Sequence, residues 1–407
     1  MFGSISCSGE CNFALLQTSF KPKYGHITGG KRTMTQKHSN NCITRIFSWK
    51  ILLVLAIALN GCINSGCSGS GNGDDMGGPD AGITDDAPPF TNGVSMLSGA
   101  AEAGFIDGPR GIARFANPVN VAFGANDMLY VADFDNGKIR IVDPSTGQTD
   151  TLIEADNFRR PFGMAFAPDQ TLYVTTDTND KGANNLMSGT VWRIDINAKT
   201  AVVIARDIGR PRGIVVLPDG RLALSDYVHH VIQLLDPTTS TLTVLAGTWD
   251  VKGRADSPDA KFSAPYGMAL LQSGKLVVAD FDNHQLRLVG LDGNVETLAG
   301  AGIAGFVDGS LNTTQFNNPQ GVCVASNGDI FVTDTVNYRI RRIRNDAVDT
   351  IAGNGEPGYL DNDDRLAAKL FGLEGISLKP DGSALFVADG GRGEDVPYNR
   401  IRVIKMN

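Results

Sequence analysis

The feature of this sequence that most restricts its fold is a segment that recurs six times along the chain. Each copy contains a short apolar stretch, and in five copies that stretch follows a proline. The copies occupy residues 117–121, 160–164, 210–214, 264–268, 318–322 and 372–376, and the last one lacks the proline. A period of a few tens of residues is typical of solenoids and propellers, in which each unit packs against its neighbours.

Each copy continues with further stretches that have the length and composition of β-strands. The second stretch ends in aspartate and covers residues 129–133, 172–177, 222–226, 276–280, 330–334 and 385–389. Third stretches follow at residues 139–142, 191–194, 231–234, 286–289, 339–343 and 401–404. These short strands, with 48 glycines and few helix-length apolar stripes, predict an all-β fold: a β-propeller with six blades of four antiparallel strands each.

The fourth strands predict how the ring closes. Five copies end in such a strand, at residues 151–153, 202–204, 242–247, 295–300 and 348–353, whereas the sixth copy has none. A matching stretch, residues 94–99, precedes the first copy instead. We therefore expect the N-terminal strand to complete the last blade, because an open joint would expose a sheet edge.

The order Pro-x-Gly-apolar, Leu-Tyr-Val-Ala-Asp and Ile-Arg-Ile resembles the NHL repeat. The second and third of these motifs stand at residues 129–133 and 139–141, and the resemblance covers residues 94–407. It implies a six-bladed propeller domain over residues 91–407. Similar propellers bind proteins or RNA, act as sensors or catalyse reactions, so the resemblance leaves the function open.

The N-terminal segment, residues 1–61, predicts export. Arg45 and Lys50 precede nine apolar residues, 51–59, a run too short to span a bilayer as a helix but suited to a secretion signal. The run ends in Leu-Asn-Gly-Cys, which resembles a bacterial lipobox and implies lipidation of Cys62. An ordinary cleaved signal and a short buried helix are the alternatives, and Met34 is a second candidate for the start of the protein.

Residues 62–90 are rich in Gly, Ser, Asp and Pro and nearly lack large apolar side chains. Such a segment cannot offset the entropy of ordering, so we expect a flexible lipoprotein tether. The expected protein is an extracytoplasmic monomer in the bacterial cell envelope, at the outer membrane, which meets the membrane only through its lipid anchor.

The net charge limits the kinds of partner that the protein can bind. The cysteine content limits how the fold can be stabilised. The chain has 36 basic and 44 acidic side chains; residues 1–61 hold seven and one of them, which leaves 29 and 43, a net charge of −14. Such a surface repels phosphate backbones, so we expect no nucleic-acid partner. Beyond Cys62 only Cys67 and Cys323 remain, so packing rather than disulfides must stabilise the fold.

The six aspartates that end the second strands are interpreted as structural, because a residue repeated in every blade serves the same purpose in every blade. A strand-end carboxylate can accept hydrogen bonds from amides of the following turn. Four of these aspartates have a long polar side chain seven positions later, as in Asp133 and Arg140, and Arg193 and Arg402 are expected to serve the other two blades. We expect these arginines between blades, paired with carboxylates or carbonyls.

Function is expected where the repeats disagree. The residue that follows each proline, or its equivalent, begins the innermost strand and is expected to face the central funnel. These residues are Val119, Phe162, Arg212, Tyr266, Gln320 and Glu374. Loops after the aspartates are expected to line the same face with Phe134, Asp135, Tyr227, His229, Phe281, Asp282 and Thr335. Among these, Phe162, Arg212, Tyr266, Gln320, Glu374, Tyr227, His229 and Asp282 form the predicted ligand site, and the alternative is that the loop residues are exposed without a role.

The sequence offers little for metal-dependent catalysis. The peptide-amidating lyases, which are similar propellers, hold zinc with three histidines near the axis. Beyond the tether this chain has only His229, His230 and His284, and the first two are adjacent and so diverge. Lactonase-like propellers hold calcium with carboxylates and an amide, a set that Glu374 with Gln320 or Asn120 matches only faintly.

We therefore predict a binding module for a protein, peptide or glycan at the funnel face, with no metal or other cofactor and no catalytic residue. A propeller hydrolase or lyase acting on a small substrate is the alternative. Residues 177–182 resemble part of a calcium loop without its closing glutamate, and we interpret them as an exposed hairpin. This hairpin and the loop of residues 391–398 are the expected places of partner contact.

Overall fold

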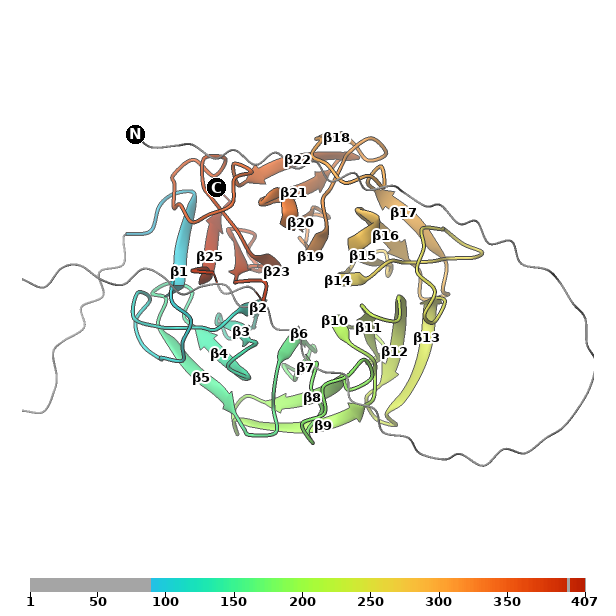
Figure 1. Cartoon of the computed structure of the whole chain (residues 1–407), viewed down its shortest axis with the longest axis horizontal. Coiled ribbons are helices and arrows are strands. Elements are labelled where there is room, and N and C mark those ends of the chain that lie inside the picture. Colours follow the sequence, from blue (N-terminus) through green and yellow to red (C-terminus); the bar gives the residue numbers. More distant parts are fainter. Residues whose placement is uncertain (1–88, 394–395, 407) are drawn as a thin grey trace, which may run out of the picture. The chain divides into compact units, whose positions relative to one another are not determined.

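The computed structural model describes residues 89–393 and 396–406, which form a β-propeller of six sheets around a central axis (Figure 1). The repeat thus predicts the architecture correctly. The predicted signal segment, Cys62 and residues 63–88 of the predicted tether lie outside the described residues. Among the residues described, no helix is long and apolar enough to span a membrane.

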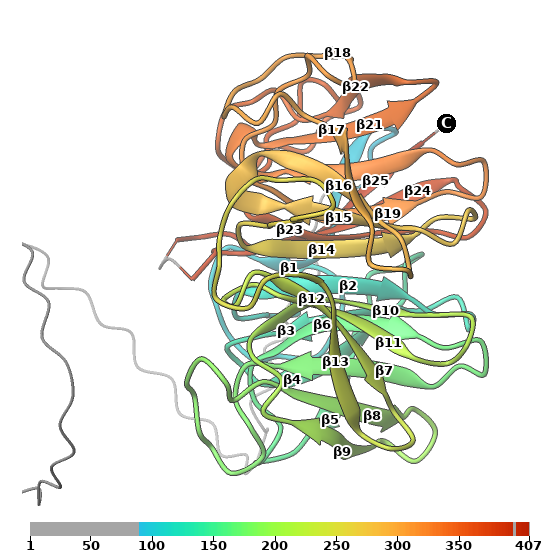
Figure 2. The same cartoon turned by 90° about the vertical axis from the view of Figure 1, so that its right-hand side faces the viewer.

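The strands of each sheet follow one another outward from the axis, and Figure 2 shows them from the side. Blade one contains β2 (Pro118–Phe123), β3 (Leu129–Asp133), β4 (Lys138–Val142) and β5 (Thr149–Glu154), and blade two contains β6 (Pro161–Phe166), β7 (Leu172–Thr176), β8 (Thr190–Asp195) and β9 (Thr200–Arg206). Blade three contains β10 (Pro211–Val216), β11 (Leu222–Asp226), β12 (Val231–Asp236) and β13 (Thr241–Gly247).

The second half of the ring repeats this order. Blade four contains β14 (Pro265–Leu270), β15 (Leu276–Asp280), β16 (Gln285–Val289) and β17 (Val295–Ala299). Blade five contains β19 (Pro319–Val324), β20 (Ile330–Asp334), β21 (Arg339–Arg344) and β22 (Ala347–Ala352), with the short β18 (Gly309–Ser310) added at its edge. Blade six contains β23 (Leu373–Leu378), β24 (Ala384–Asp389), β25 (Asn399–Lys405) and β1 (Val94–Ala100), and single 3-10 turns, η1 (Phe281–Asn283) and η2 (Thr335–Asn337), follow β15 and β20.

The ring closes as predicted, through pairing of the first and last strands. β1 runs antiparallel to β25, from Val94 opposite Ile404 to Ala100 opposite Asn399. In Figure 1 the blue strand β1 therefore lies beside the red strand β25. Blade six takes three strands from the end of the chain and one from the beginning of its described part, so no blade is left with three strands.

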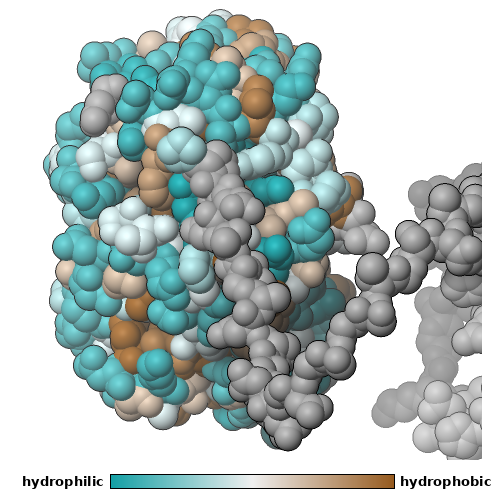
Figure 3. Space-filling view, turned by 90° about the vertical axis from the view of Figure 1, so that its left-hand side faces the viewer, coloured by the Kyte–Doolittle hydropathy of each residue, from teal (hydrophilic) through white to brown (hydrophobic). Residues whose placement is uncertain are grey.

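The core lies between the blades. Strands β3, β11, β15 and β20 are buried along their whole length, because each blade packs both of its faces against neighbours. Large aromatic side chains such as Trp192, Phe115, Phe262 and Phe316 fill the spaces between sheets. The outer rim seen in Figure 3 is largely hydrophilic, with small hydrophobic patches.

Glycine at the third position of the inner strands permits the close approach of neighbouring blades. A Cβ atom at Gly213 would lie 2.6 Å from the carbonyl oxygen of Tyr266 in the next blade, and one at Gly163 would lie 2.8 Å from the carbonyl oxygen of Arg212. Both distances are shorter than a carbon can tolerate, so only glycine fits at these positions. These glycines therefore permit close packing of neighbouring blades near the axis.

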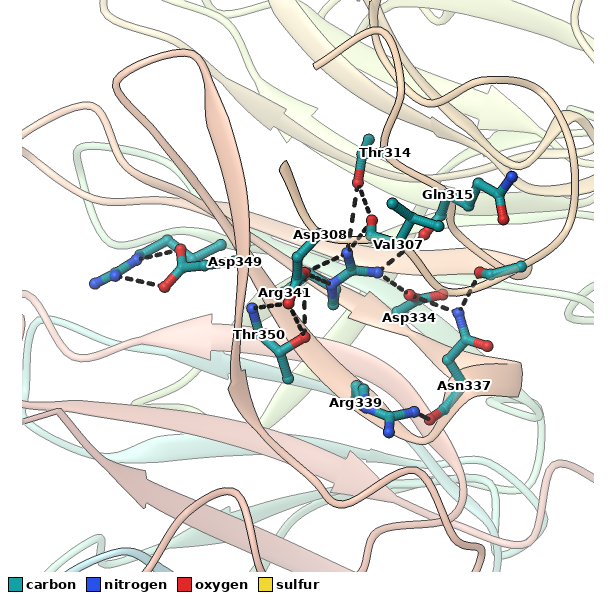
Figure 4. A network of polar contacts seen from close by, with 12 residues as sticks. Val307, Asp308, Thr314, Gln315, Asp334, Asn337, Arg339, Arg341, Asp349 and Thr350 are labelled. Atoms are coloured by element: carbon teal, nitrogen blue, oxygen red, sulfur yellow. Dashed lines mark hydrogen bonds and ion pairs between the residues drawn. The ribbon is translucent and has the colours of Figure 1, made fainter. Parts of the chain in front are cut away.

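A buried arginine joins each of four blades to the long loop that enters it. In blade five, Arg341 donates to Asp334 Oδ2 over 2.6 Å and to Asp308 Oδ1 over 2.5 Å, and also to the carbonyl oxygens of Val307 and Gln315 (Figure 4). The side chains of Arg341 and Asp334 are both fully buried. The aspartate belongs to the end of β20, whereas the other acceptors belong to the incoming loop, so one guanidinium holds both segments.

The same arrangement recurs wherever the incoming loop is long. The corresponding pairs are Arg140 with Asp133 and Asp107, Arg287 with Asp280 and Asp256, and Arg402 with Asp389 and Asp361. The loops that enter these four blades span residues 101–117, 248–264, 300–318 and 353–372. The interpretation of the repeated aspartates as structural is therefore confirmed for these blades.

Blades two and three depart from this arrangement, and both are entered by short loops, residues 155–160 and 207–210. In blade two the prediction was wrong by one residue. Thr176, not Asp177, pairs with the start of the inner strand, and Trp192, not Arg193, lies at the arginine position and donates to the hydroxyl of Thr176 over 3.0 Å. Asp177 therefore does not have the structural role that the sequence pattern predicted for it.

Replacing Arg341 by methionine should strongly destabilise the propeller. The substitution leaves Asp334 buried without its partner, which costs about 3–5 kcal/mol. Arg342→Met is the matched control, because the neighbouring Arg342 pairs with the half-exposed Asp349 and such surface pairs contribute about 0–1 kcal/mol. Urea unfolding of both variants measures the difference, and equal losses of free energy of unfolding would contradict the proposed role of Arg341.

Candidate functional site

The inner strands surround a cavity of about 200 Å³ on the axis. Phe162, Arg212, Tyr266 and Glu374, each the second residue of its strand, line the cavity. Side chains at the opposite ends of β2 and β6, among them Phe123 and Phe166, line it too, so the cavity runs along the axis. Pro118 pairs with Asp133, and therefore the loops that follow the strand-end aspartates lie on the same face as these second residues.

Arg212 forms two hydrogen bonds with Asp177, which lies one residue beyond the structural position in blade two. Its Nη1 lies 2.5 Å from Asp177 Oδ1 and its Nη2 lies 3.2 Å from Asp177 Oδ2. Arg210 approaches the same carboxylate from the short loop before β10, with its Nη2 2.5 Å from Oδ2. The Asp177 side chain is fully buried, so two cations share one desolvated anion at the axis.

Aromatic rings surround the Arg212 guanidinium. Its central carbon lies 4.2 Å from the centre of the Phe162 ring and 5.3 Å from that of Tyr227, distances typical of cation–π contacts. Tyr266 packs edge to face against both rings and stacks on Phe281 at 5.5 Å. These rings come from blades two, three and four, and Phe134 of blade one adds a further ring that packs edge to face against Phe162.

Tyr266 also connects this cluster to Glu374 across the axis. The Tyr266 hydroxyl donates to Glu374 Oε2 over 3.2 Å. The strands that carry the two residues, β14 and β23, are separated by a whole blade along the ring. The hydrogen bond therefore spans the centre of the propeller and brings an acid, a phenol and a guanidinium to one cavity.

Burial shapes the ionisation of these groups. It raises the pKa of Glu374 to about 7, although Arg212, Tyr266 and Arg392 act in the opposite direction. Burial and the neighbouring Glu374 hold the pKa of Tyr266 well above its usual range. For Asp177, burial alone would raise the pKa, but Arg212 and Arg210 outweigh it and hold the pKa below the ordinary value. The cavity is thus lined by a glutamate that titrates near neutrality and by an arginine whose partner, Asp177, is ionised.

The structure brings together five of the eight residues predicted from the sequence. Phe162, Arg212, Tyr266 and Glu374 line the cavity and Tyr227 contacts two of them. Gln320 is the second residue of β19, the equivalent position, and is buried. It does not line the cavity, and its Oε1 has no hydrogen-bond partner in the described part of the chain.

His229 and Asp282 lie elsewhere. His229 is buried, its Nδ1 is 2.6 Å from Asp226 Oδ2, and its ring stacks on Trp249 at 4.2 Å. It therefore replaces, in blade three, the asparagine that contacts the strand-end aspartate in other blades, such as Asn283 beside Asp280. Asp282 is exposed in η1 and does not line the cavity.

The other histidines join neighbouring blades. The Nδ1 atoms of His230 and His284 accept hydrogen bonds from the backbone N–H groups of Ala264 and Asn318, over 3.0 Å and 3.1 Å. Desolvation lowers the pKa of both rings, which agrees with neutral imidazoles acting as acceptors. Within residues 89–393 and 396–406, no three histidine, cysteine or acidic side chains cluster in a way that could hold a metal ion.

Asp177 is the site residue that the sequence analysis missed. Its only sequence signal is the extra threonine in Thr175-Thr176-Asp177, where the five other blades have a single residue between the strand core and the aspartate. The extra residue moves the carboxylate to the position that Tyr227 and Phe281 hold in the next two blades.

Glu374→Gln should raise the melting temperature at pH 8 but not at pH 4.5. The folded-state pKa of about 7 lies above the ordinary 4.5, so the folded protein loses stability as the pH rises between these values. Glutamine carries no charge and avoids that loss. Thermal unfolding between pH 4.5 and 8 measures the effect, with the exposed Glu296→Gln as the control. An equal gain at both pH values would show that ionisation of Glu374 is not its cause.

Comparison with known proteins agrees with this architecture. A model of the NHL repeat family matches residues 316–343. The chain is 27% identical over 286 residues to Protein SUPPRESSOR OF QUENCHING 1, chloroplastic, of Arabidopsis thaliana, which covers 61% of this chain and 27% of that protein. It is 38% identical over 187 residues to NHL repeat-containing protein 2 of Homo sapiens, which covers 44% of this chain and 22% of that protein. The matched regions thus span about a quarter of these relatives.

A solved structure shows the same fold. The crystal structure of an auxiliary nutrient binding protein from Bacteroides thetaiotaomicron VPI-5482 superposes with a TM-score of 0.61 at 19% identity, over 76% of this chain and 75% of that one. Six sheets arranged around one axis and the match of residues 316–343 to the NHL repeat agree with each other. The chain is a six-bladed β-propeller, and residues 316–343 match the NHL repeat.

Proposed function

We propose that this protein is a binding module that holds a small ligand, or the end group of a glycan or peptide, in its axial cavity. The observation that carries the proposal is the cluster of Asp177, Arg212, Tyr266 and Glu374. These side chains occupy equivalent or adjacent positions in different blades, yet they differ from blade to blade. A structural element would repeat, as the Asp–Arg pairs do, whereas this cluster does not.

The composition of the cavity supports binding. Small-molecule sites are largely apolar and contain a few convergent polar groups that orient the ligand. Here Met164, Ile214, Met268 and Ile376 form an apolar wall, and three members of the polar cluster line the same cavity, namely Arg212, Tyr266 and Glu374. The propeller named an auxiliary nutrient binding protein shares the fold, and its name makes nutrient-sized compounds the first probes to test.

A second candidate, catalysis on a small substrate, rests on one observation. A buried carboxyl with a pKa near neutrality, hydrogen-bonded to a phenol and close to a guanidinium, has the character of a general acid or base. We favour binding because the described residues hold no recognised nucleophile and base pair beside it. Analysis of each compound after incubation with the protein separates the two candidates, because a bound ligand is recovered unchanged and a substrate is not.

Ligands of the cavity should stabilise the full chain in a thermal-shift screen of sugars, amino acids and organic acids. At 100 times its Kd a ligand contributes about 2.7 kcal/mol, enough for a clear shift. Arg212→Met should abolish that shift, because it removes the cation from the cavity. Arg206→Met is the control, since Arg206 pairs with Asp180 in the exposed hairpin region. A ligand whose shift survives Arg212→Met binds elsewhere and contradicts the proposed site.

We also propose that Cys62 carries a lipid that anchors the propeller in the bacterial cell envelope. The support is the Leu-Asn-Gly-Cys sequence after nine apolar residues, followed by a segment rich in Gly, Ser and Asp. In this arrangement the tether leads into β1, the strand that closes the ring.

Cys62→Ser should move the protein from the membrane fraction to the soluble fraction of a Gram-negative host, because it removes the acylated thiol. Detergent phase partitioning measures the change. Cys67→Ser is the matched control, five residues further along the same segment, and should leave the protein with the membrane. Identical partitioning of the two variants would rule out anchoring through Cys62.

A further inference from the structure

We infer that the ligand of the axial cavity is a small organic carboxylate, of about the size of one six-membered ring. The inference rests on the proposed function and adds the chemical class of the ligand. It follows from the charge at the axis, from the unused donors of Arg212 and from the size and walls of the cavity.

The axis carries an excess of positive charge in an otherwise acidic protein. Arg210 and Arg212 share the single carboxylate of Asp177. Arg392, in the loop after β24, lies close enough to favour ionisation of Glu374. Burial opposes that ionisation, so Glu374 compensates only part of the cationic charge at neutral pH. An anion that enters the cavity therefore experiences attraction, although the chain as a whole repels anions.

Arg212 retains donors for a second anion. Asp177 accepts from its Nη1 and Nη2 and so uses two of its five N–H groups. No other acceptor for this guanidinium is found in the part of the chain that the structure describes. Its side chain is only 11% exposed and it lines the cavity, so the remaining N–H groups need water or a ligand. Carboxylate oxygens match the guanidinium geometry well.

The size of the cavity limits the rest of the ligand. A protein cavity of about 150 Å³ can hold benzene. At about 200 Å³ this cavity accommodates one ring with a carboxylate, but not a folded peptide or a nucleotide. Its walls beyond the polar cluster are formed by Met164, Ile214, Met268 and Ile376, which suits the apolar body of a ring.

The test compares matched acid and neutral probes on the full chain by calorimetry and thermal shift. The pairs are benzoate with benzamide and glucuronate with glucose, and inorganic phosphate is the anion without a ring. We expect at least one acid to bind about tenfold or more tightly than its neutral partner, as a charge-assisted hydrogen bond implies. Benzoate binding indicates an aromatic acid and glucuronate binding a sugar acid, whereas phosphate should bind more weakly than either.

Variants show whether the preference comes from the proposed groups. Arg212→Met should abolish the preference for the acid, whereas Arg206→Met should retain it. Equal affinity for an acid and its neutral partner, or tighter binding of phosphate, overturns the carboxylate inference and leaves the proposed binding site intact. Failure of all five probes also overturns it, and the broader thermal-shift screen then decides the proposed function separately.

Discussion

A buried guanidinium that satisfies two segments at once is the interaction on which this propeller depends. A long loop entering a blade exposes carbonyl groups that must find donors, and the end of the second strand presents a carboxylate that must find a counter-charge. Arg341 meets both needs from within β21, because its planar fork reaches Asp334 and Asp308 together with two loop carbonyls. Each of the four arginines thereby joins the loop that enters its blade to the end of the second strand.

The exceptions follow from the same constraint. The loops that enter blades two and three are short and have few groups to hold, so an arginine there would lack half of its acceptors. Trp192 with Thr176, and Gln233 with Asp226 and His229, serve instead. Freed from the pairing, the sequence around Asp177 could change, and its carboxylate lies at the axis. The candidate site thus includes a residue of blade two, which is entered by a short loop and has no Asp–Arg pair.

Much of the fold could be predicted because the same pattern of strands recurs six times in the sequence. The number of blades, the role of residues 94–99 and three of the four Asp–Arg pairs follow from the regular spacing, whereas Asp389 and Arg402 are 13 residues apart. The position of Asp177 could not be predicted, because one inserted threonine changes which residue ends the strand without changing its apolar pattern. The contact between Asp177 and Arg212 joins residues 35 positions apart in different blades, and no local spacing predicts it. His229 was misassigned because a histidine in a loop gives no signal of whether it faces the axis or a neighbouring aspartate.

The pairing of β1 with β25 has a consequence for how the molecule forms. Val94 and Ile404 are about 310 residues apart, so this contact cannot be made until β25 has been synthesised. Until then β1 has no partner strand and blade six lacks an outer edge. Contacts of such long range slow folding, because a large loop must close before they contribute. Before β25 is available the blades can form only an open arc with two unpaired edges, and the pairing of β1 with β25 closes that arc into a ring.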